Sequence, residues 1–199
     1  PSLSIVYSGS SLLQIETARG DLSRRQGCYE LKGLSFREFL AFEGVYRGDV
    51  VQLEDLLRHH REIAQPLLSA FKVLPLFDRY LRQGYYPFYR EPGGLYEQRL
   101  GEVVNKVLES DWTSIAEVSV ETVRKAKKML MILAASVPQQ PNMSRLYREL
   151  ETERNTGLKI LGALERGGLL ALVPPKGETL KNLSKPEKIY CDNTNLMYA

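Results

Sequence analysis

The segment Ser4–Leu13, near the start of the chain, constrains the fold more than any other part of the sequence. It opens with the apolar run Ser4–Tyr7, rich in β-branched and aromatic residues, which predicts a buried strand. Serines and a glycine interrupt the run at 8–11, and the leucines that follow favour a helix. In α/β sheets built from such units, ligands bind beyond the carboxyl ends of the strands. Ser10 and Ser11 are therefore expected to face a ligand crevice.

A second strand is predicted at Cys28–Leu31, after a polar loop. Two strands cannot form a parallel sheet, which needs several buried neighbours. Because the chain begins just before the first strand, we expect more of the sheet to lie upstream in the complete protein. Residues 1–34 are then expected to be poorly protected, or to associate with another chain, since exposed strand edges promote pairing.

The middle of the chain has apolar residues at helical spacing. Ser35 and Glu38 stand three residues apart, as in a capping box that begins a helix. Further helices are expected over residues 49–63, 67–81, 95–108 and 118–135, with a break at Pro75. Successive helices with short connections indicate a helical bundle. The aromatic loop 85–89 is expected to pack between helices, and stacking on nucleic-acid bases is the alternative.

The last third has the order of a winged helix-turn-helix. A short helix begins at Asn142 or Ser144, and after a turn a second helix covers Asn155–Arg166. A hairpin with strands at 169–173 and 188–191 follows. In the second helix we expect the leucines to face inward, at Leu158, Leu161 and Leu164. The whole chain is thus predicted to be α+β and mostly helical.

Three segments together resemble the back half of an AAA+ ATPase core: Val6–Leu12, Gly20–Arg25 and Tyr29–Leu40. More narrowly, they are similar to prokaryotic ATPases that carry a winged helix and a C-terminal domain of unknown function. Lys185–Met197 resembles the junction with that last domain.

The resemblance implies three parts: residues 1–34 as the end of an α/β AAA+ core, 35–117 as a helical lid bundle and 118–199 as a winged-helix domain. In the similar ATPases, the polar residue that ends the strand orients the attacking water and senses the γ-phosphate. The resemblance assigns this catalytic role to Ser10, with Ser8 as the alternative. Arg24 and Arg25 match a basic position where such ATPases can place an arginine that contacts phosphate, which suits a permanently charged guanidinium. The other interpretation is that Ser10 caps a helix and that both arginines lie exposed on a loop.

The residues that would hydrolyse a nucleotide are missing from this sequence. The pattern Gly-x-x-x-x-Gly-Lys-Ser/Thr is absent, and Gly157 and Gly162, which have the right spacing, precede Ala-Leu within a predicted helix. No apolar strand ends in an acidic pair that could hold Mg²⁺. The chain alone is therefore not expected to hydrolyse ATP. By resemblance, ATP and Mg²⁺ are cofactors of the complete protein, with none expected for these residues.

No metal site is predicted. Cys28 and Cys191 are isolated, without the spacing of a zinc site or a disulfide framework. His59 and His60 are neighbours on a predicted helix, where adjacent side chains point about 100° apart and cannot chelate one ion together.

The two parts of the chain differ in charge. Residues 1–121 carry 14 Lys and Arg against 17 Asp and Glu, whereas residues 122–199 carry 13 against 7. A basic C-terminal part suggests nucleic acid as a partner. The candidate contacts for phosphates and base edges are Arg154, Asn155, Thr156, Lys159, Arg166 and, on the wing, Lys176, with Lys181 and Lys185 as additions. Four nearby glutamates would oppose DNA binding, so a winged helix that contacts only protein is the alternative.

The sequence therefore predicts the lid and winged-helix portion of an ATP-binding AAA+-like ATPase, inactive alone. The alternative is a winged-helix transcription regulator without ATPase activity. The expected partners are duplex DNA at the winged helix and a protein, or a second copy, at residues 1–34. No apolar run reaches the length of a membrane helix, and isolated cysteines favour a reduced compartment, so a cytoplasmic location and no membrane contact are predicted.

Overall fold

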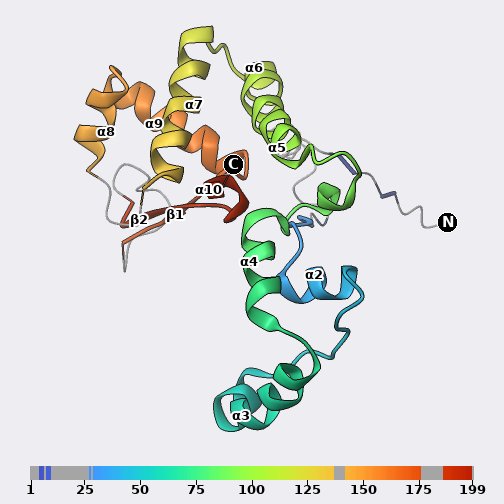
Figure 1. Ribbon diagram of the computed structural model, residues 1–199. Helices are drawn as coiled ribbons and strands as arrows, with labels where there is room; N and C mark the ends of the chain where they lie inside the picture. The colour runs from blue at the N-terminus through green and yellow to red at the C-terminus, as the bar shows by residue number, and fades with distance from the viewer. Residues whose placement is uncertain are drawn as a thin grey trace, which may run out of the picture. The chain divides into compact units, whose positions relative to one another are not determined.

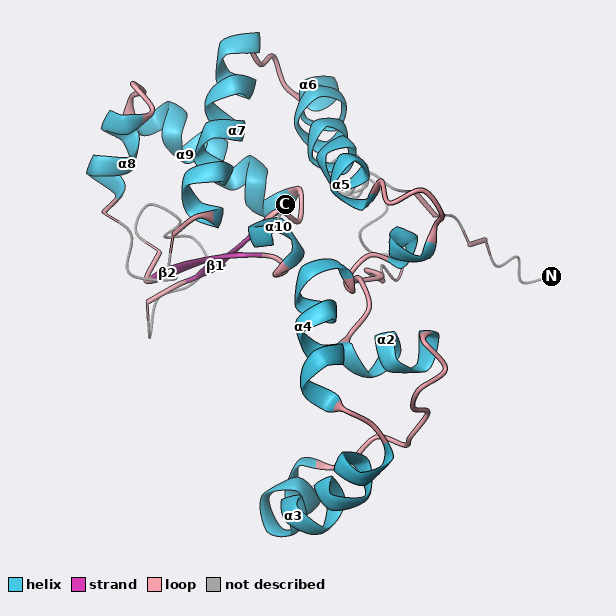
Figure 2. Ribbon diagram, viewed as in Figure 1, coloured by secondary structure: helices cyan, strands magenta, loops and turns pink. Residues whose placement is uncertain are grey.

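The computed structural model describes residues 5–6, 8–9, 27, 29–136, 142–175 and 186–198. These residues are mostly helical and contain one two-stranded sheet (Figures 1 and 2). This confirms the predicted α+β, mostly helical class. The chain divides into two compact units. Unit 1 comprises residues 1–29 and 97–197, and unit 2 comprises residues 30–96 and 198–199. The division into three domains at residues 34 and 117 stays a prediction.

The prediction of two strands at the start of the chain is wrong for the residues that the structure describes there. Ile5 and Val6 adopt no strand and are 74% and 95% exposed. Tyr29 and Leu31, in the second expected strand, are 95% and 99% exposed. An apolar segment becomes a strand only when a neighbouring strand accepts and donates its backbone hydrogen bonds. Among the described residues, these two segments have no such neighbour.

Unit 2 contains three α-helices and one 3₁₀ turn. These are α2 (Phe36–Phe42), α3 (Leu53–Ala70), α4 (Val73–Gln83) and η1 (Pro87–Arg90). The capping box is confirmed: the Ser35 backbone N–H donates to the Glu38 carboxylate at 2.8 Å, and the Glu38 N–H donates to Ser35 Oγ at 3.3 Å. This reciprocal pair begins α2 at the predicted residue.

The predicted boundaries of α3 and α4 need correction. α3 begins at Leu53 rather than residue 49, and α4 begins after an extended break at Phe71 and Lys72. Pro75 lies in the first turn of α4, where its missing N–H leaves no hydrogen bond unmade, so it does not break the helix. Instead, the backbone leaves helical geometry at His59, with φ −125° and ψ 21°.

Aromatic rings form the core of unit 2. Phe39 is fully buried, and the rings of Phe36, Tyr80 and Tyr89 lie with centroids 5.2–6.3 Å from it. The remaining rings of the aromatic loop contact one another in a chain that runs through Tyr85, Tyr86, Phe88 and Tyr96. The loop thus packs its rings on neighbouring rings, as the packing interpretation predicted.

A carboxylate anchors the edge of this core. Glu43 accepts hydrogen bonds from the Tyr89 hydroxyl and the Arg79 guanidinium, each at 2.6 Å. Burial raises the pKa of Glu43, but these two hydrogen bonds and the positive charges of Arg79 and Arg90 outweigh burial and hold the pKa below its usual value. Burial and the hydrogen bond to this carboxylate raise the pKa of Tyr89.

Unit 2 is therefore expected to lose stability in acid through Glu43. A carboxyl whose pKa is lower in the folded state stabilises the fold above its unfolded pKa, near 4.5, and this contribution disappears as the pH falls through the folded value. Lowering the pH from about 6 to about 3 should thus destabilise wild-type unit 2 more than a Glu43→Gln variant. Urea denaturation monitored by hydrogen exchange over residues 36–90 measures the difference. Equal losses of stability in both proteins would contradict the role of Glu43.

Unit 1 contains the remaining elements, except for their end residues Tyr96 and Tyr198, which fall in unit 2. They are α5 (Tyr96–Asn105), the π-helical turn η2 (Lys106–Asp111), α6 (Trp112–Ile115), α7 (Val120–Ala134), α8 (Met143–Glu149), α9 (Arg154–Arg166), β1 (Leu170–Val173), β2 (Lys188–Cys191) and α10 (Asn195–Tyr198). The helix predicted at 95–108 continues through η2 and α6 to residue 115. The helices predicted at 118–135, 142–150 and 155–166 agree with the structure to within about two residues.

The C-terminal elements pack around one apolar core. β1 and β2 form an antiparallel pair, with Leu170 opposite Cys191 and Val173 opposite Lys188. α7 packs on α9 and β2, α9 packs on β1, and α8 packs on α9 (Figure 2). The fully buried side chains at the centre come from α7 and α9, namely Ala126, Met129, Ile160, Leu161, Ala163 and Leu164.

The turn between α8 and α9 has a well-defined geometry. The Thr152 N–H donates to the Tyr147 carbonyl and the Glu151 N–H to the Arg148 carbonyl, the two bonds of a Schellman motif. Glu151 has a φ of 48°, in the left-handed region that this motif requires. From α7, Lys125 Nζ donates to the Glu151 carbonyl at 2.7 Å. This hydrogen bond ties the turn to α7.

Candidate nucleic-acid interface

One face of α9 carries three of the five nucleic-acid contacts that were predicted on this helix. Arg154, Asn155, Lys159 and Arg166 are exposed, and Thr156 is half-buried. Asn155, Lys159 and Arg166 recur at intervals of four and seven residues, so they share one side of the helix. Asparagine, lysine and arginine are side chains that donate hydrogen bonds to base edges and phosphates. The helix therefore presents a polar, cationic stripe to solvent.

The opposite face of α9 packs in the core, with one change from the predicted set. Leu161 and Leu164 are fully buried as expected, but Leu158 is half-buried. Gly157 and Ile160 take the inward positions instead. Residues 157, 160, 161 and 164 follow the i, i+3, i+4, i+7 spacing of a single helical face, and residue 158 lies outside it.

Gly157 permits close contact between α8 and α9. A Cβ placed on Gly157 would lie 2.3 Å from the Tyr147 ring. Tyr147 is 7% exposed, and its hydroxyl has no hydrogen-bond partner among the described residues. Burial raises the pKa of this hydroxyl, and the nearby Arg154 guanidinium partly offsets the rise. The ring thus fixes how α9 leaves the turn, and so the direction in which its exposed face points.

The cations of α9 differ from those of α7 in their contacts. On α7, Lys125 pairs with Glu121 and also donates to the Glu151 carbonyl, and Lys127 pairs with Glu109. Lys128 donates to the Glu149 carbonyl at the end of α8. In the part of the chain that the structure describes, no ion pair joins Lys159 or Arg166 to an acidic side chain. These two cations are available to an external anion.

Three of the four glutamates that would oppose DNA lie before α9. Glu149 accepts from Arg145 at 3.2 Å, which offsets part of its charge, and Glu151 and Glu153 are exposed on the turn. The fourth, Glu165, is on α9 itself and is half-buried. Lys159 lies six residues after Glu153, about 9 Å along the helix axis. The cationic stripe is therefore separated from the acidic turn.

Several predicted site residues lie outside the described residues. The three residues to which the resemblance gave a catalytic role are among them: Ser10, Arg24 and Arg25. So are the three lysines predicted on the wing: Lys176, Lys181 and Lys185. Ser8 is described and exposed. The sequence predicted no structural role for Gly157 or Gly162, because the effect of a missing side chain depends on which atoms would surround it in the folded protein. Their six-residue span was visible in the sequence, but no pattern linked it to Tyr147.

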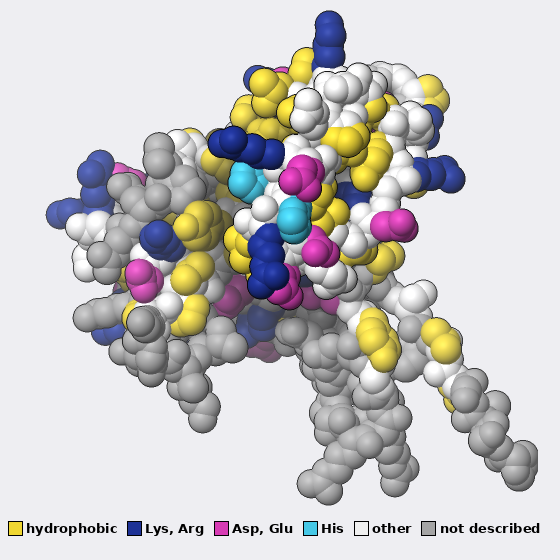
Figure 3. Space-filling view, turned by 90° about the horizontal axis from the view of Figure 1, so that it is seen from below, with side chains coloured by type: hydrophobic (Ala, Val, Ile, Leu, Met, Phe, Trp, Pro, Cys, Tyr) yellow, Lys and Arg dark blue, Asp and Glu magenta, His cyan; other side chains and the backbone are white. Residues whose placement is uncertain are grey.

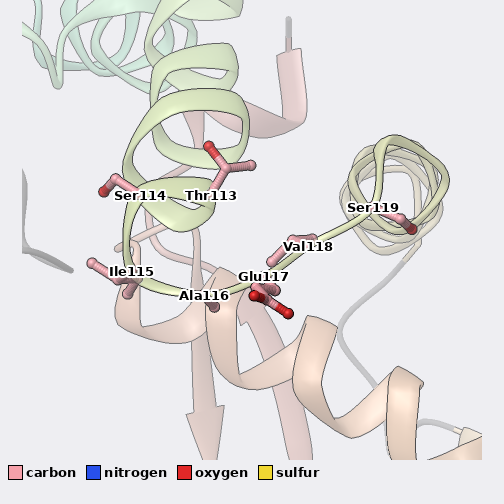
Figure 4. A pocket seen from close by; sticks show the side chains of 7 residues that line it. All are labelled: Thr113, Ser114, Ile115, Ala116, Glu117, Val118 and Ser119. Carbon is pink, nitrogen blue, oxygen red and sulfur yellow. The ribbon is translucent and has the colours of Figure 1, made fainter.

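A surface hollow is lined by Thr113–Ser119, between α6 and α7 (Figure 4). Its hydroxyl groups already form hydrogen bonds with nearby backbone groups. Thr113 donates to the Glu109 carbonyl, and Ser119 accepts from the Thr122 N–H as the N-cap of α7. Glu117 is the one acidic residue among the seven that line it. The hollow therefore lacks the convergent polar groups of a ligand site.

The other candidates in the described regions do not form a site. His59 and His60 are exposed on α3, and Figure 3 shows the two histidines at the surface beside apolar side chains. His59 Nδ1 lies 3.3 Å from Glu62. No cluster of three or more metal-ligating side chains is present within the ranges that the structure covers. None of the helices described is both long and apolar enough to cross a membrane.

Comparison with known proteins places these elements in a family. The model of a domain of unknown function, DUF8612, matches residues 74–199. The chain belongs to the DUF8612 family. The DUF8612 match includes all of α9 and the β1–β2 hairpin.

The DUF8612 chain is also similar to a longer archaeal protein. It is 25% identical, over 189 residues or 93% of its length, to the uncharacterized protein MJ1637 of Methanocaldococcus jannaschii. The matched region makes up 40% of that protein, so the chain spans about two fifths of the length of this relative. No solved structure matches the chain.

Proposed function

We propose that residues 120–198 form a winged helix that binds duplex DNA through the exposed face of α9. The order α7, α8, turn, α9, hairpin supports this proposal, because a winged helix-turn-helix places its third helix in the major groove. The observation that carries it is the stripe of Asn155, Lys159 and Arg166, whose two cations have no acidic partner among the described residues. The basic excess of residues 122–199 favours the same partner.

The chain is further proposed to be the lid and winged-helix portion of a larger AAA+-like ATPase. Two observations support this. The first is the similarity of Val6–Leu12 and Tyr29–Leu40 to such ATPases. The second is that the archaeal relative is a longer protein, of which the chain spans 40%. In this proposal α2–α4 belong to the lid, and ATP and Mg²⁺ bind to parts of the protein beyond these residues. Thermal stabilisation by Mg-ATP of a full-length relative, but not of this chain, would agree. Absence of stabilisation in both would favour a winged-helix transcription regulator without ATPase activity.

DNA binding by α9 is expected to depend on salt, because each phosphate that the protein neutralises releases counterions. Lys159→Ala and Arg166→Ala should each weaken binding of a random duplex. A variant that no longer neutralises one phosphate should also flatten the plot of log K against log salt by about one unit. Fluorescence anisotropy at two or more salt concentrations measures both effects.

Lys127→Ala is the matched control for this titration. It removes the same charge from unit 1, but its ammonium is already paired with Glu109 at 2.5 Å. Its effect on affinity should be smaller than that of either α9 substitution. A wild-type protein without saturable binding at low salt would exclude duplex DNA and leave a protein-contact role for α9.

A further inference from the structure

The first turn of α9 is not capped. The N–H groups of Arg154, Asn155 and Thr156 precede the first hydrogen bond within the helix, which runs from the Gly157 N–H to the Glu153 carbonyl at 2.9 Å. Glu153 is the N-cap residue, and its side chain makes no capping hydrogen bond. Among the described residues, none accepts from these three N–H groups. They lie at the start of a thirteen-residue helix, where the helix dipole favours a negative charge.

A buried hydroxyl lies beside the same turn. The Tyr147 ring packs against Gly157, and Cζ, the carbon that carries the hydroxyl, is 3.1 Å from the position of a Gly157 Cβ. Tyr147 is 7% exposed, and its hydroxyl has no hydrogen-bond partner among the described residues. Burial raises the pKa of this hydroxyl, and the positive charge of Arg154 partly offsets the rise. Arg154 and Gly157 are three residues apart and share a helix face, so the hydroxyl faces the first turn of α9.

Packing alone does not explain the Tyr147 hydroxyl. Phenylalanine would fill the same space against Gly157, and it would avoid the cost of a buried polar group without a hydrogen bond. An unpaired buried hydroxyl beside uncapped N–H groups indicates a ligand that accepts hydrogen bonds from both. Arg154 adds a positive charge that no described acidic side chain pairs with. The ligand that fits these donors is therefore an anion.

We propose that the start of α9 binds a phosphate group, held by the N–H groups of residues 154–156, the Tyr147 hydroxyl and the Arg154 guanidinium. Phosphate suits this set because its oxygens accept several hydrogen bonds at once and arginine contacts two of them together. Thr156, half-buried in the same turn, supplies a further hydroxyl. Because the Tyr147 hydroxyl is covered in the free protein, we expect the exposed Arg154 side chain to move as it closes on the phosphate.

Two glutamates near the site oppose an anion. Glu151 and Glu153 are exposed, so water and salt screen their charges, whereas the N–H groups and the hydroxyl contact the phosphate directly. The site is separate from the cations of Lys159 and Arg166, and it does not rest on the proposed DNA binding. Its phosphate can come from a free small molecule or from a nucleic-acid backbone, and the two sources need separate titrations.

The first titration adds inorganic phosphate to isotope-labelled protein at constant ionic strength, followed by NMR. The backbone amide signals of residues 154–156 should shift saturably, and chloride should not reproduce the shifts. Tyr147→Phe should weaken phosphate binding by about tenfold or more, since it removes a hydrogen bond to a charged group. In urea the variant should be at least as stable as the wild type, because it also removes an unpaired buried hydroxyl. A purely structural tyrosine would not separate affinity from stability in this way.

Tyr190→Phe is the matched control, because it removes the same atom from β2 in the same unit. Its affinity for phosphate should equal that of the wild type. Arg154→Gln should also weaken phosphate binding, because it removes the positive charge at the first turn. The second titration replaces inorganic phosphate with a random DNA duplex and follows the same amide signals.

Two results support the site. Reduced affinity for inorganic phosphate in Tyr147→Phe but not in Tyr190→Phe supports it with a free phosphate as the ligand. If only the duplex shifts the three amides, and Tyr147→Phe binds it more weakly, the phosphate belongs to DNA. The site is overturned if neither ligand shifts these amides saturably, or if Tyr147→Phe binds both as tightly as the wild type. The proposed DNA contacts of Lys159 and Arg166 stand or fall by their own titration.

Discussion

Gly157→Ala is expected to destabilise unit 1 by about 2 kcal/mol, the middle of the range for overpacked cores. The new methyl group would lie 2.3 Å from the Tyr147 ring, which is 7% exposed. α8 and α9 must then separate, and this cost exceeds the gain from alanine in a helix, which is about 1 kcal/mol at most. Trp112 is the one tryptophan of the chain and is buried in unit 1, so its fluorescence in a urea titration measures the change.

Two further variants test the cause. Gly162→Ala introduces the same methyl group five residues along α9, where the nearest surrounding atom is 4.0 Å away, and should stabilise unit 1 instead. Tyr147→Leu removes the ring edge, so Gly157→Ala should be much less harmful in that background, with a coupling of about 1 kcal/mol or more in the double-mutant cycle. A Gly157→Ala protein as stable as the wild type would show that Tyr147 does not press on Gly157.

Phe39→Ala is expected to have the largest effect in unit 2, about 3–5 kcal/mol, the range for a fully buried aromatic side chain. Phe39 is 0% exposed, and it contacts the rings of Phe36, Tyr80 and Tyr89. The Arg79 guanidinium also lies 5.5 Å from its centroid. A destabilisation of this size is comparable with the whole stability of a small unit. Hydrogen exchange over α2 and α4 should therefore become fast in the variant.

Phe42→Ala is the matched control for Phe39→Ala, because it removes the same atoms from the same helix. Phe42 is 46% exposed, so less apolar surface returns to water when its ring is removed. Its effect should be well below that of Phe39→Ala. All the contacts named for Phe39 lie in unit 2, so the Trp112 transition should stay in place in both variants. Equal effects of the two substitutions would show that Phe39 is not the centre of the unit 2 core.

Local patterns in the sequence determined most of the helices and both strands of the hairpin. The Ser35 and Glu38 capping box is confirmed because its hydrogen bonds join residues three apart and need no distant partner. α7, α8 and α9 begin and end near their predicted residues for the same reason. Their apolar spacing, the N-cap residues Ser119 and Asn142, and the Gly167 C-cap all act within one or two turns.

Properties that depend on distant neighbours were decided by the tertiary structure. The run Ile-Val-Tyr has the composition of a strand, yet Ile5 and Val6 are exposed, because a strand exists only where another pairs with it. The break between α3 and α4 falls at Phe71 rather than at Pro75, since proline is tolerated in a first turn.

The two glycines of α9 show most clearly which properties the sequence determines and which the tertiary structure decides. The sequence places Gly157 and Gly162 on one helix, five residues apart, and nothing in it separates their roles. Only the packed structure brings the Tyr147 ring against Gly157 and leaves room for a methyl group at Gly162. The energy of a missing side chain is set by the atoms that would surround it, and these come from other parts of the chain.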